Sequence, residues 1–348
     1  MKIPLIISIQ LPGLKICINT NNRKYYNYLA ACFNKITAGE NSAGCQMQID
    51  VCWQDKPRLG SSGMYALGAN TLVGEQKLAT QRKIGRKTKI WFEYFFTKDC
   101  FKLSAALKVK PLKDFMRYVV LGQQREPHFF DLTYPLVYYP AFWYLEYFKN
   151  IHPLHASALK NNGRCILICG LEGIGKTTLS LELSKDAGGQ FFSDNLILHD
   201  DKHIYPCYEP IRIHKAEDIS LWQGRFKKIN DFRALKDFYE PVDFDSGLKG
   251  SPDIVLIPAF GKEFSCRQMA RDECVNKILN INNLTAELGN YNEYAHLLSL
   301  MAADFNLAQE RFNTLNALIN KATCYELIMR KSDGINENTR RAKEIIFS

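Results

Sequence analysis

Apolar residues recur along the first part of the chain with two different periods, which predict strands alternating with helices. Two apolar runs, at residues 3–9 and 14–18, flank Leu-Pro-Gly and predict a β-hairpin. Apolar positions at helical spacing predict a helix over residues 23–36. Residues 57–75 are rich in glycine and serine and predict a mobile loop. Alternating or apolar runs predict three further strands, at residues 46–53, 90–96 and 100–107.

The pattern becomes helical from Pro111 and ends in an aromatic segment, residues 129–148, in which Pro140 is expected to open a helix. Acidic residues and prolines interrupt this segment, so it does not predict a membrane span. An aromatic stripe of this kind more often forms a core or a domain interface than a ligand box. Its members are Tyr138, Tyr139, Phe142, Trp143, Tyr147 and Phe148.

Beyond residue 150 the pattern predicts an α/β nucleotide-binding domain built around a phosphate loop. Two strands, 154–160 and 164–169, are joined by Asn161-Asn162-Gly163, a tight-turn sequence. A glycine-rich loop and a helix over residues 176–185 follow. The remaining expected elements are strands at 190–199, 204–214 and 254–257, helical structure over 284–319, and a strand at 323–329.

Charge divides the 348-residue chain at the same place. The whole chain carries a formal net charge of +9, but residues 1–150 hold 21 basic and 10 acidic side chains, and the remainder is close to neutral. This asymmetry predicts two domains with different tasks, a smaller basic α+β domain over residues 1–150 and a second domain over residues 151–348. Eleven Lys and Arg fall within residues 77–113. They predict a solvated face, or a surface that attracts an acidic peptide, nucleic acid or a membrane. The basic first domain as a whole could also hold an acidic acceptor.

Composition and local motifs bear on which partners are expected and on where in the cell the protein is located. No known nucleic-acid-binding motif is present, so no nucleic-acid partner is expected. The eleven cysteines include no C-x-x-C pair, which predicts reduced thiols and no zinc site. The N-terminal apolar run is interrupted by Pro12-Gly13 and does not resemble a secretory signal. A cytoplasmic protein is therefore expected, and the sequence leaves open whether it forms homo-oligomers.

One motif carries specific chemistry. Gly170-Leu171-Glu172-Gly173-Ile174-Gly175-Lys176-Thr177-Thr178 fits the phosphate-loop pattern G-x-x-x-x-G-K-[ST] and lies between a predicted strand and a predicted helix. Glycines let backbone N–H groups converge on phosphate oxygens, and the helix adds its positive N-terminal end. Lys176 is expected to bind the β- and γ-phosphates of ATP, and Thr177 to bind Mg²⁺.

Mg²⁺ also needs carboxylates or water, and Asp194 is the best candidate. It follows the apolar strand after the phosphate-loop helix, where a carboxylate can bind the metal or accept a proton from an attacking hydroxyl. The alternative is a turn residue.

These motifs resemble HPr kinase/phosphorylase. Leu154-His155-Ala156-Ser157-Ala158, the strand 165–169, the phosphate loop and Ser193-Asp194-Asn195 occur in the order and spacing of that family. The loop is also similar to that of phosphoenolpyruvate carboxykinase, which shares the same nucleotide-binding fold. The resemblance covers about residues 151–260, and residues 1–150 resemble no family by motif. It implies that residues 151–348 form an ATP-binding catalytic domain, an α/β phosphate-loop domain of the HPr kinase/phosphoenolpyruvate carboxykinase type.

The resemblance also implies roles for single residues. His155 matches the histidine that faces the transferred phosphoryl group, and Asp194 matches the first acid of an Asp-Asp pair. Asn195 replaces the second acid and Glu172 replaces a serine, so the chain departs from the family at two positions. Glu209 loosely matches a glutamate near the metal, and Arg212 close by is a candidate substrate contact; a surface pair is the alternative for both.

Three functions are compatible with these residues. The first is an ATP- and Mg²⁺-dependent kinase that phosphorylates a serine-type hydroxyl on a protein, peptide or small molecule, with catalytic residues Asp194, His155 and Lys176. The second is a carboxykinase-like lyase, for which a second set of metal ligands is lacking in the sequence. The third is a nucleotide-binding scaffold or sensor that transfers no phosphate. Retention of Lys176, Thr177, Asp194 and His155 together favours the kinase.

Overall fold

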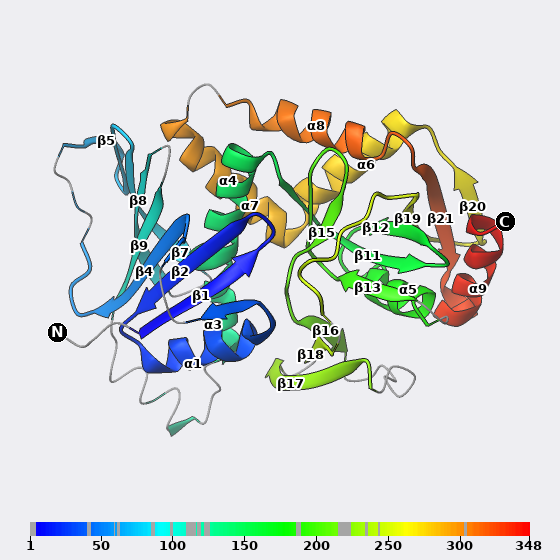
Figure 1. The fold of residues 1–348 in the computed structure, drawn as a ribbon, viewed down its shortest axis with the longest axis horizontal. Helices are drawn as coiled ribbons and strands as arrows, with labels where there is room; N and C mark the ends of the chain where they lie inside the picture. Colours follow the sequence, from blue (N-terminus) through cyan, green and yellow to red (C-terminus); the bar gives the residue numbers. More distant parts are fainter. Residues whose placement is uncertain are drawn as a thin grey trace. The chain divides into compact units, whose positions relative to one another are not determined.

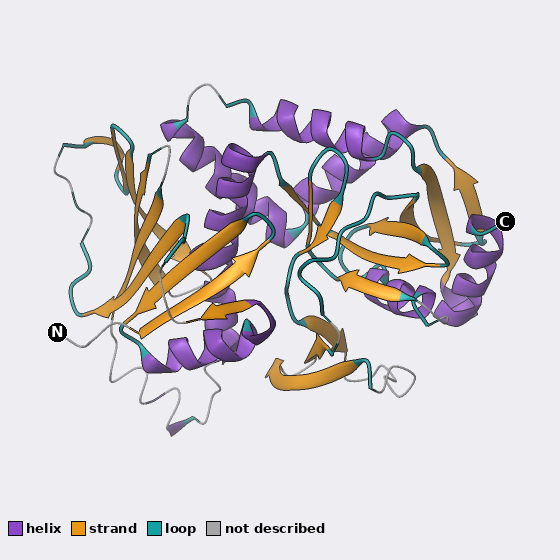
Figure 2. Ribbon diagram, viewed as in Figure 1, coloured by secondary structure: helices purple, strands orange, loops and turns teal. Residues whose placement is uncertain are grey.

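The computed structural model shows a mixed α/β protein with several mixed sheets (Figures 1 and 2). It divides the chain into two compact units. Unit 1 is Met1–Lys149 with Glu293–Phe305, and unit 2 is Asn150–Asn292 with Asn306–Ser348. The structure describes residues 5–348 except 40–42, 59, 61–62, 85–87, 98–99, 109–115, 117–119, 122–125, 186–188, 215–223, 234–235, 243 and 303–304.

Unit 1 is built on one nine-stranded mixed sheet with the order β3-β1-β2-β4-β9-β8-β7-β6-β5. Strand β2 pairs in parallel with β4, and β4 in parallel with β9, while the other neighbours are antiparallel. Its strands are β1 (Leu5–Leu11), β2 (Leu14–Thr20), β3 (Thr37–Gly39), β4 (Met47–Gln54), β5 (Tyr65–Gly68), β6 (Thr71–Gly74), β7 (Lys77–Ile84), β8 (Thr88–Phe96) and β9 (Phe101–Lys108).

Alternation along the strands gives this sheet one apolar face. In β9 the side chains of Phe101, Leu103, Ala105 and Leu107 are buried and those between them are more exposed. Helices pack on the apolar face, where Phe101 lies 5.4 Å from Trp143 between ring centroids. The aromatic segment is thus core. The helices are α1 (Arg23–Cys32), a 3₁₀ turn (Asn34–Ile36), α3 (Glu126–Thr133), a π-helical turn (Tyr134–Tyr138) and α4 (Tyr139–Lys149).

Unit 2 contains a six-stranded mixed sheet with the order β13-β11-β12-β19-β21-β20, in which β12, β19 and β21 run parallel. Two three-stranded sheets, β10-β14-β15 and β16-β18-β17, accompany it. The strands are β10 (His152–Leu154), β11 (Ala156–Asn161), β12 (Arg164–Cys169), β13 (Gln190–Ser193), β14 (Ile197–His199), β15 (Ile204–Pro206), β16 (Ile211–His214), β17 (Phe226–Arg233), β18 (Lys236–Pro241), β19 (Ile254–Gly261), β20 (Ser265–Gln268) and β21 (Thr323–Arg330).

Helices cover both faces of the six-stranded sheet. Alternate residues of β12 point to opposite sides: Ile166 and Ile168 pack with α5 and α9, whereas Leu167 packs with α6 and α8. A sheet buried on both faces explains why β12 and β19 read as continuous apolar runs. The helices of unit 2 are α5 (Lys176–Leu183), α6 (Arg271–Leu284), α8 (Leu307–Leu318) and α9 (Gly334–Ile346), with a 3₁₀ turn at Lys331–Asp333. Helix α7 (Ala286–Leu298) begins in unit 2 and continues into the unit 1 segment, which also holds the 3₁₀ turn Ser299–Met301.

Several expected elements differ from those observed. Residues 57–75, expected to be a loop, include β5 and β6, and β7 had no sequence counterpart. The expected strands 190–199 and 204–214 each divide in two, and the expected helix over 284–319 divides into α7 and α8. Pro140 does not open a helix, because the π-helical turn joins α3 to α4 without a break. Most of residues 111–125 lies outside the described residues.

The domain expected over residues 151–348 includes Glu293–Phe305, whereas the structure places these residues in unit 1. Across the ranges that the structure describes, no helix is both long enough and apolar enough to cross a membrane.

Candidate functional site

The phosphate loop joins the end of β12 to the start of α5, and its glycines are required by its backbone. Gly173 and Gly175 have φ angles of 78° and 86°, in the left-handed region that side chains other than glycine adopt at a cost. A Cβ on Gly170 would lie 2.9 Å from Cγ2 of Ile174. Gly175 caps α5, and its carbonyl accepts from the N–H of Leu179 at 2.8 Å. The unpaired N–H groups of the first turn of α5 therefore open toward the loop.

Lys176 is buried, and its ammonium has three hydrogen-bond acceptors around it. Nζ lies 2.8 Å from the carbonyl oxygen of Gly170, 3.0 Å from that of Leu171 and 2.9 Å from Nε2 of His155. Burial lowers the pKa of Lys176, against an opposing effect of Asp194. The sequence-predicted residues Lys176 and His155 are thus in direct contact.

Asp194 follows β13 and accepts hydrogen bonds from two hydroxyls. Thr177 Oγ1 donates to Oδ2 at 2.7 Å, and Ser157 Oγ donates to Oδ1. Asp194 is buried, with 5% of its surface exposed. Each carboxylate oxygen has two lone pairs, so the carboxylate can accept further donors or bind a cation. The predicted pair of Thr177 and Asp194 therefore forms one cluster beside the phosphate loop.

Asn195 has a φ of 69°, a conformation that asparagine tolerates better than most residues. Its Nδ2 donates to Oε2 of Glu209 at 2.6 Å, so the residue that replaces the family's second acid holds a buried glutamate. Glu209 also lies 3.9 Å from Nη2 of Arg212. The surface-pair alternative for Glu209 and Arg212 is wrong, because Glu209 is buried and the Arg212 side chain is 15% exposed.

Arg212 connects this cluster to a residue that the sequence did not suggest. Its Nη2 donates to Oε1 of Glu287 at 3.0 Å, and Oε2 of Glu287 lies 3.9 Å from Nδ1 of His155. The backbone N–H of His155 donates to Oδ1 of Asn282 at 3.1 Å. Glu287 and Asn282 belong to α7 and α6, so the C-terminal helices complete the surroundings of His155.

These surroundings determine the charge of His155. Burial lowers its pKa to about 3, and the positive charges of Lys176 and Arg212 act in the same direction, while Glu287 opposes them. Burial acts to raise the pKa of Glu287, but Arg212 and His155 outweigh it, so this pKa lies below its usual value. His155 is therefore neutral and Glu287 is ionised near pH 7.

Ser157 and Glu287 were missed from the sequence for different reasons. Ser157 had a detectable signal: it lies in the motif Leu154-His155-Ala156-Ser157-Ala158, two positions after His155. Glu287 lies 75 residues beyond Arg212 in a helix whose sequence carries no motif. Glu172 lies on the exposed part of the phosphate loop and Thr178 in the first turn of α5.

The donor set fits Mg²⁺ bound together with a nucleotide. No group of three or more His, Cys, Asp or Glu side chains that could hold a metal occurs among the described residues. Mg²⁺ in nucleotide sites usually takes one or two carboxylates, with phosphates and water as the other ligands. Thr177 and Asp194, hydrogen-bonded to each other beside the loop, are the residues that would hold it.

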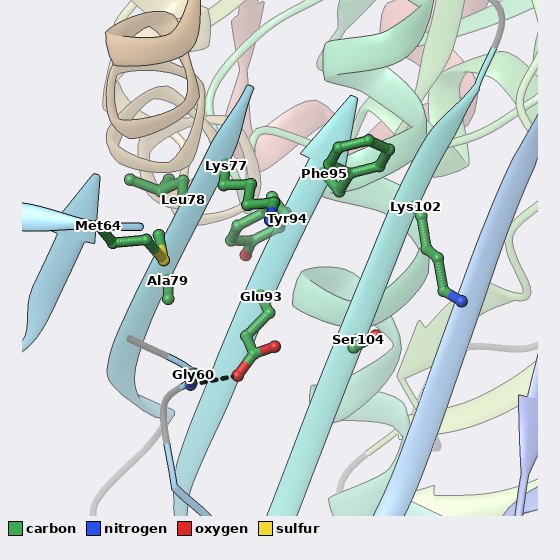
Figure 3. Close-up of a pocket in the computed structure, with 10 residues that line it drawn as sticks. All are labelled: Gly60, Met64, Lys77, Leu78, Ala79, Glu93, Tyr94, Phe95, Lys102 and Ser104. Atoms are coloured by element: carbon green, nitrogen blue, oxygen red, sulfur yellow. Dashed lines mark hydrogen bonds between the residues drawn. The ribbon is translucent and has the colours of Figure 1, made fainter. Parts of the chain in front are cut away.

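A separate pocket of about 260 Å³ lies on the more polar face of the sheet in unit 1 (Figure 3). Side chains from β7, β8 and β9 line it, and the backbone N–H of Gly60 donates to Oε1 of Glu93 at 2.6 Å across one side. The wall also includes Lys77, Phe95, Lys102 and Ser104. None of the phosphate-loop residues takes part in it.

Comparison of the chain with protein-family models finds no matching family, and comparison with curated proteins finds no match. The resemblance to HPr kinase therefore rests on the sequence motifs of this chain alone.

Proposed function

We propose that this protein is an ATP- and Mg²⁺-dependent phosphotransferase of the HPr kinase/phosphoenolpyruvate carboxykinase type, which phosphorylates a serine-type hydroxyl. The observation that carries the proposal is the cluster at the phosphate loop. Asp194 accepts from Thr177 at 2.7 Å, and Lys176 contacts His155 at 2.9 Å. Lys176 and His155 form one hydrogen-bonded pair, and Thr177 and Asp194 form a second. Both pairs lie in unit 2, although the partners of each pair are distant in the sequence.

Each residue has a distinct task in this proposal. The N–H groups of the loop and of the first turn of α5 bind phosphate oxygens, and the Lys176 ammonium exchanges its carbonyl partners for the β- and γ-phosphates. Mg²⁺, when bound, supplies positive charge to the same phosphates. Asp194 orients the acceptor hydroxyl and accepts its proton, since a positioned carboxylate is a suitable base for this step. Arg212 stays bound to Glu209 and Glu287, so its proposed contact is with these carboxylates and not with substrate.

The acceptor class is tested by incubating the protein with γ-labelled ATP and an extract of the source cells. Label on a protein, a peptide or a small molecule would identify the class of acceptor. Release of ADP without a labelled product would instead favour an ATPase or a nucleotide-binding scaffold.

Asp194→Asn tests the assignment of the base. The substitution keeps the shape and removes the charge and basicity, so kcat should fall by about 10²–10⁴-fold. ATP affinity should change little, because Lys176 and the backbone N–H groups provide most of the phosphate contacts. Calorimetric ATP binding and phosphotransfer rates measure the two quantities separately.

Asp201→Asn is the matched control, since Asp201 is exposed and lies outside the cluster. Unchanged phosphotransfer in Asp194→Asn would show that Asp194 is not the base.

A further inference from the structure

Two buried polar atoms face each other beside the phosphate loop without a conventional hydrogen bond. They are Nδ1 of His155 and Oε2 of Glu287, 3.9 Å apart. Neither has a hydrogen-bond partner among the residues that the structure describes. A buried polar atom without a partner is costly, so the pair needs an explanation.

The position of the imidazole proton follows from Lys176. An ammonium group has three N–H donors and no acceptor. Two acceptors of Lys176 are the carbonyl oxygens of Gly170 and Leu171, and the third is Nε2 of His155. Nε2 therefore accepts. His155 is neutral, as its low pKa also indicates, so its single ring proton lies on Nδ1 and points at Glu287.

Glu287 is held so that one oxygen remains available to His155. It lies in the first turn of α7, where a carboxylate interacts favourably with the helix N-terminus. Arg212 donates to Oε1 of Glu287 and also lies beside Glu209. The side chain of Glu287 is 12% exposed, so water screens the pairing with His155 only weakly. Oε2 is thus directed toward the imidazole.

We propose that Glu287 is a positioning residue for His155: its carboxylate faces the Nδ1–H group and so keeps Nε2, as an acceptor, directed at the phosphate loop. The catalytic meaning of this pairing rests on the proposed function. When the phosphates draw the Lys176 ammonium away, Nε2 is left as a hydrogen-bond acceptor at the phosphate loop, and Glu287 keeps it in that orientation.

Nitrogen-15 NMR of the His155 ring, assigned by comparison with His155→Gln, tests the pairing without any catalytic assay. Lys176→Met removes the donor at Nε2, and we expect the proton to remain on Nδ1, since the Glu287 carboxylate still faces it. In Lys176→Met/Glu287→Gln the single amide oxygen of residue 287 binds Arg212, and the NH₂ group faces Nδ1. Two donors cannot face each other, so the proton should move to Nε2.

The inference is overturned if the proton lies on Nε2 already in Lys176→Met, or stays on Nδ1 in the double variant. If the double variant does not fold, Lys176→Met alone decides: a proton that stays on Nδ1 supports the pairing, and a proton that moves to Nε2 overturns it.

Kinetics give an independent measurement. Glu287→Gln should lower kcat by about 100-fold with an unchanged KM for ATP, because it alters His155 and leaves the phosphate contacts in place. Glu287→Asp keeps the charge and should recover part of the rate. Glu310→Gln is the matched control, since Glu310 is also a first-turn acid of a helix in unit 2. Equal kcat in Glu287→Gln and the control would overturn the inference.

The two proposals fail in different ways. If the wild-type protein transfers no phosphoryl group, the proposed function fails, while the ring-nitrogen measurement still decides whether Glu287 positions His155.

Discussion

The protonation of His155 links the candidate site to the stability of the folded protein. Its imidazole is buried against Lys176, and both its neutral form and its orientation depend on residues from β16, α5 and α7. In the unfolded chain the same imidazole would titrate near its ordinary pKa of 6.5. The difference between the two states makes folding sensitive to pH.

The sign of this effect follows from proton binding. Between about pH 6.5 and pH 3 the unfolded chain binds a proton at His155 and the folded chain does not, so acid favours unfolding. The stabilisation is complete above pH 6.5 and is lost progressively down to about pH 3. Urea unfolding at fixed pH should therefore show a steeper decline for the wild-type protein than for His155→Gln. Parallel curves would contradict the assigned burial of a neutral His155.

At the scale of elements, sequence predicted best where a short-range rule applies. The turn Asn161-Asn162-Gly163 does join two antiparallel strands, with φ of 48° at Asn162 and 76° at Gly163, as the sequence predicts. The β1–β2 hairpin and the strand–loop–helix order at the phosphate loop are also confirmed. In these cases the residues that define the structure are neighbours in the sequence.

Predictions from the sequence were wrong or missing where residues distant in the chain determine the structure. Strands β5 and β6 contain glycine and lie at the edge of the sheet, so their pairing depends on β7 more than on their own composition. The contacts of His155 with α6 and α7 show the same limit at the site. Glu287 carries no motif, and only the folded chain brings it to Arg212.

A cavity in the six-stranded sheet of unit 2, beneath the phosphate loop, should strongly lower the free energy of unfolding. Leu167 is fully buried in β12, two residues before the strand ends, between α6, α8 and the neighbouring strands. Leu167→Ala should lower the free energy of unfolding by about 2–5 kcal/mol, the usual cost of such a truncation. Leu284→Ala is the control, because Leu284 is 72% exposed at the end of α6. Chemical denaturation measures both, and equal values would contradict the assigned core.

At the scale of the whole molecule, the two units suggest a specific truncation. All residues of the candidate site lie in unit 2, so residues 150–292 joined by a Gly/Ser linker to residues 306–348 should bind ATP. A simple 150–348 fragment keeps Tyr294 and Phe305, whose rings pack on Tyr94, Tyr139 and Tyr147 of unit 1. It should aggregate more readily, because these aromatic side chains lose their partners.

Light scattering and ATP binding by calorimetry compare the two fragments. Loss of ATP binding in the linked fragment, while it remains folded by circular dichroism, would contradict the placement of the site within unit 2. Retained ATP binding with lost phosphorylation of the acceptor would assign acceptor recognition to unit 1.

The division of unit 1 into two chain segments also has a consequence for how the protein is made. Residues 1–149 leave the ribosome first, but Glu293, which pairs with Arg82 at 2.6 Å, and Tyr294, which packs on Tyr94, are synthesised only after most of unit 2. At about 5–20 residues per second, roughly 8–30 s separate residue 149 from residue 305. During that interval the nine strands of unit 1 are already made but Glu293–Phe305 are not. The first unit to begin folding is therefore completed only after most of the second has been made.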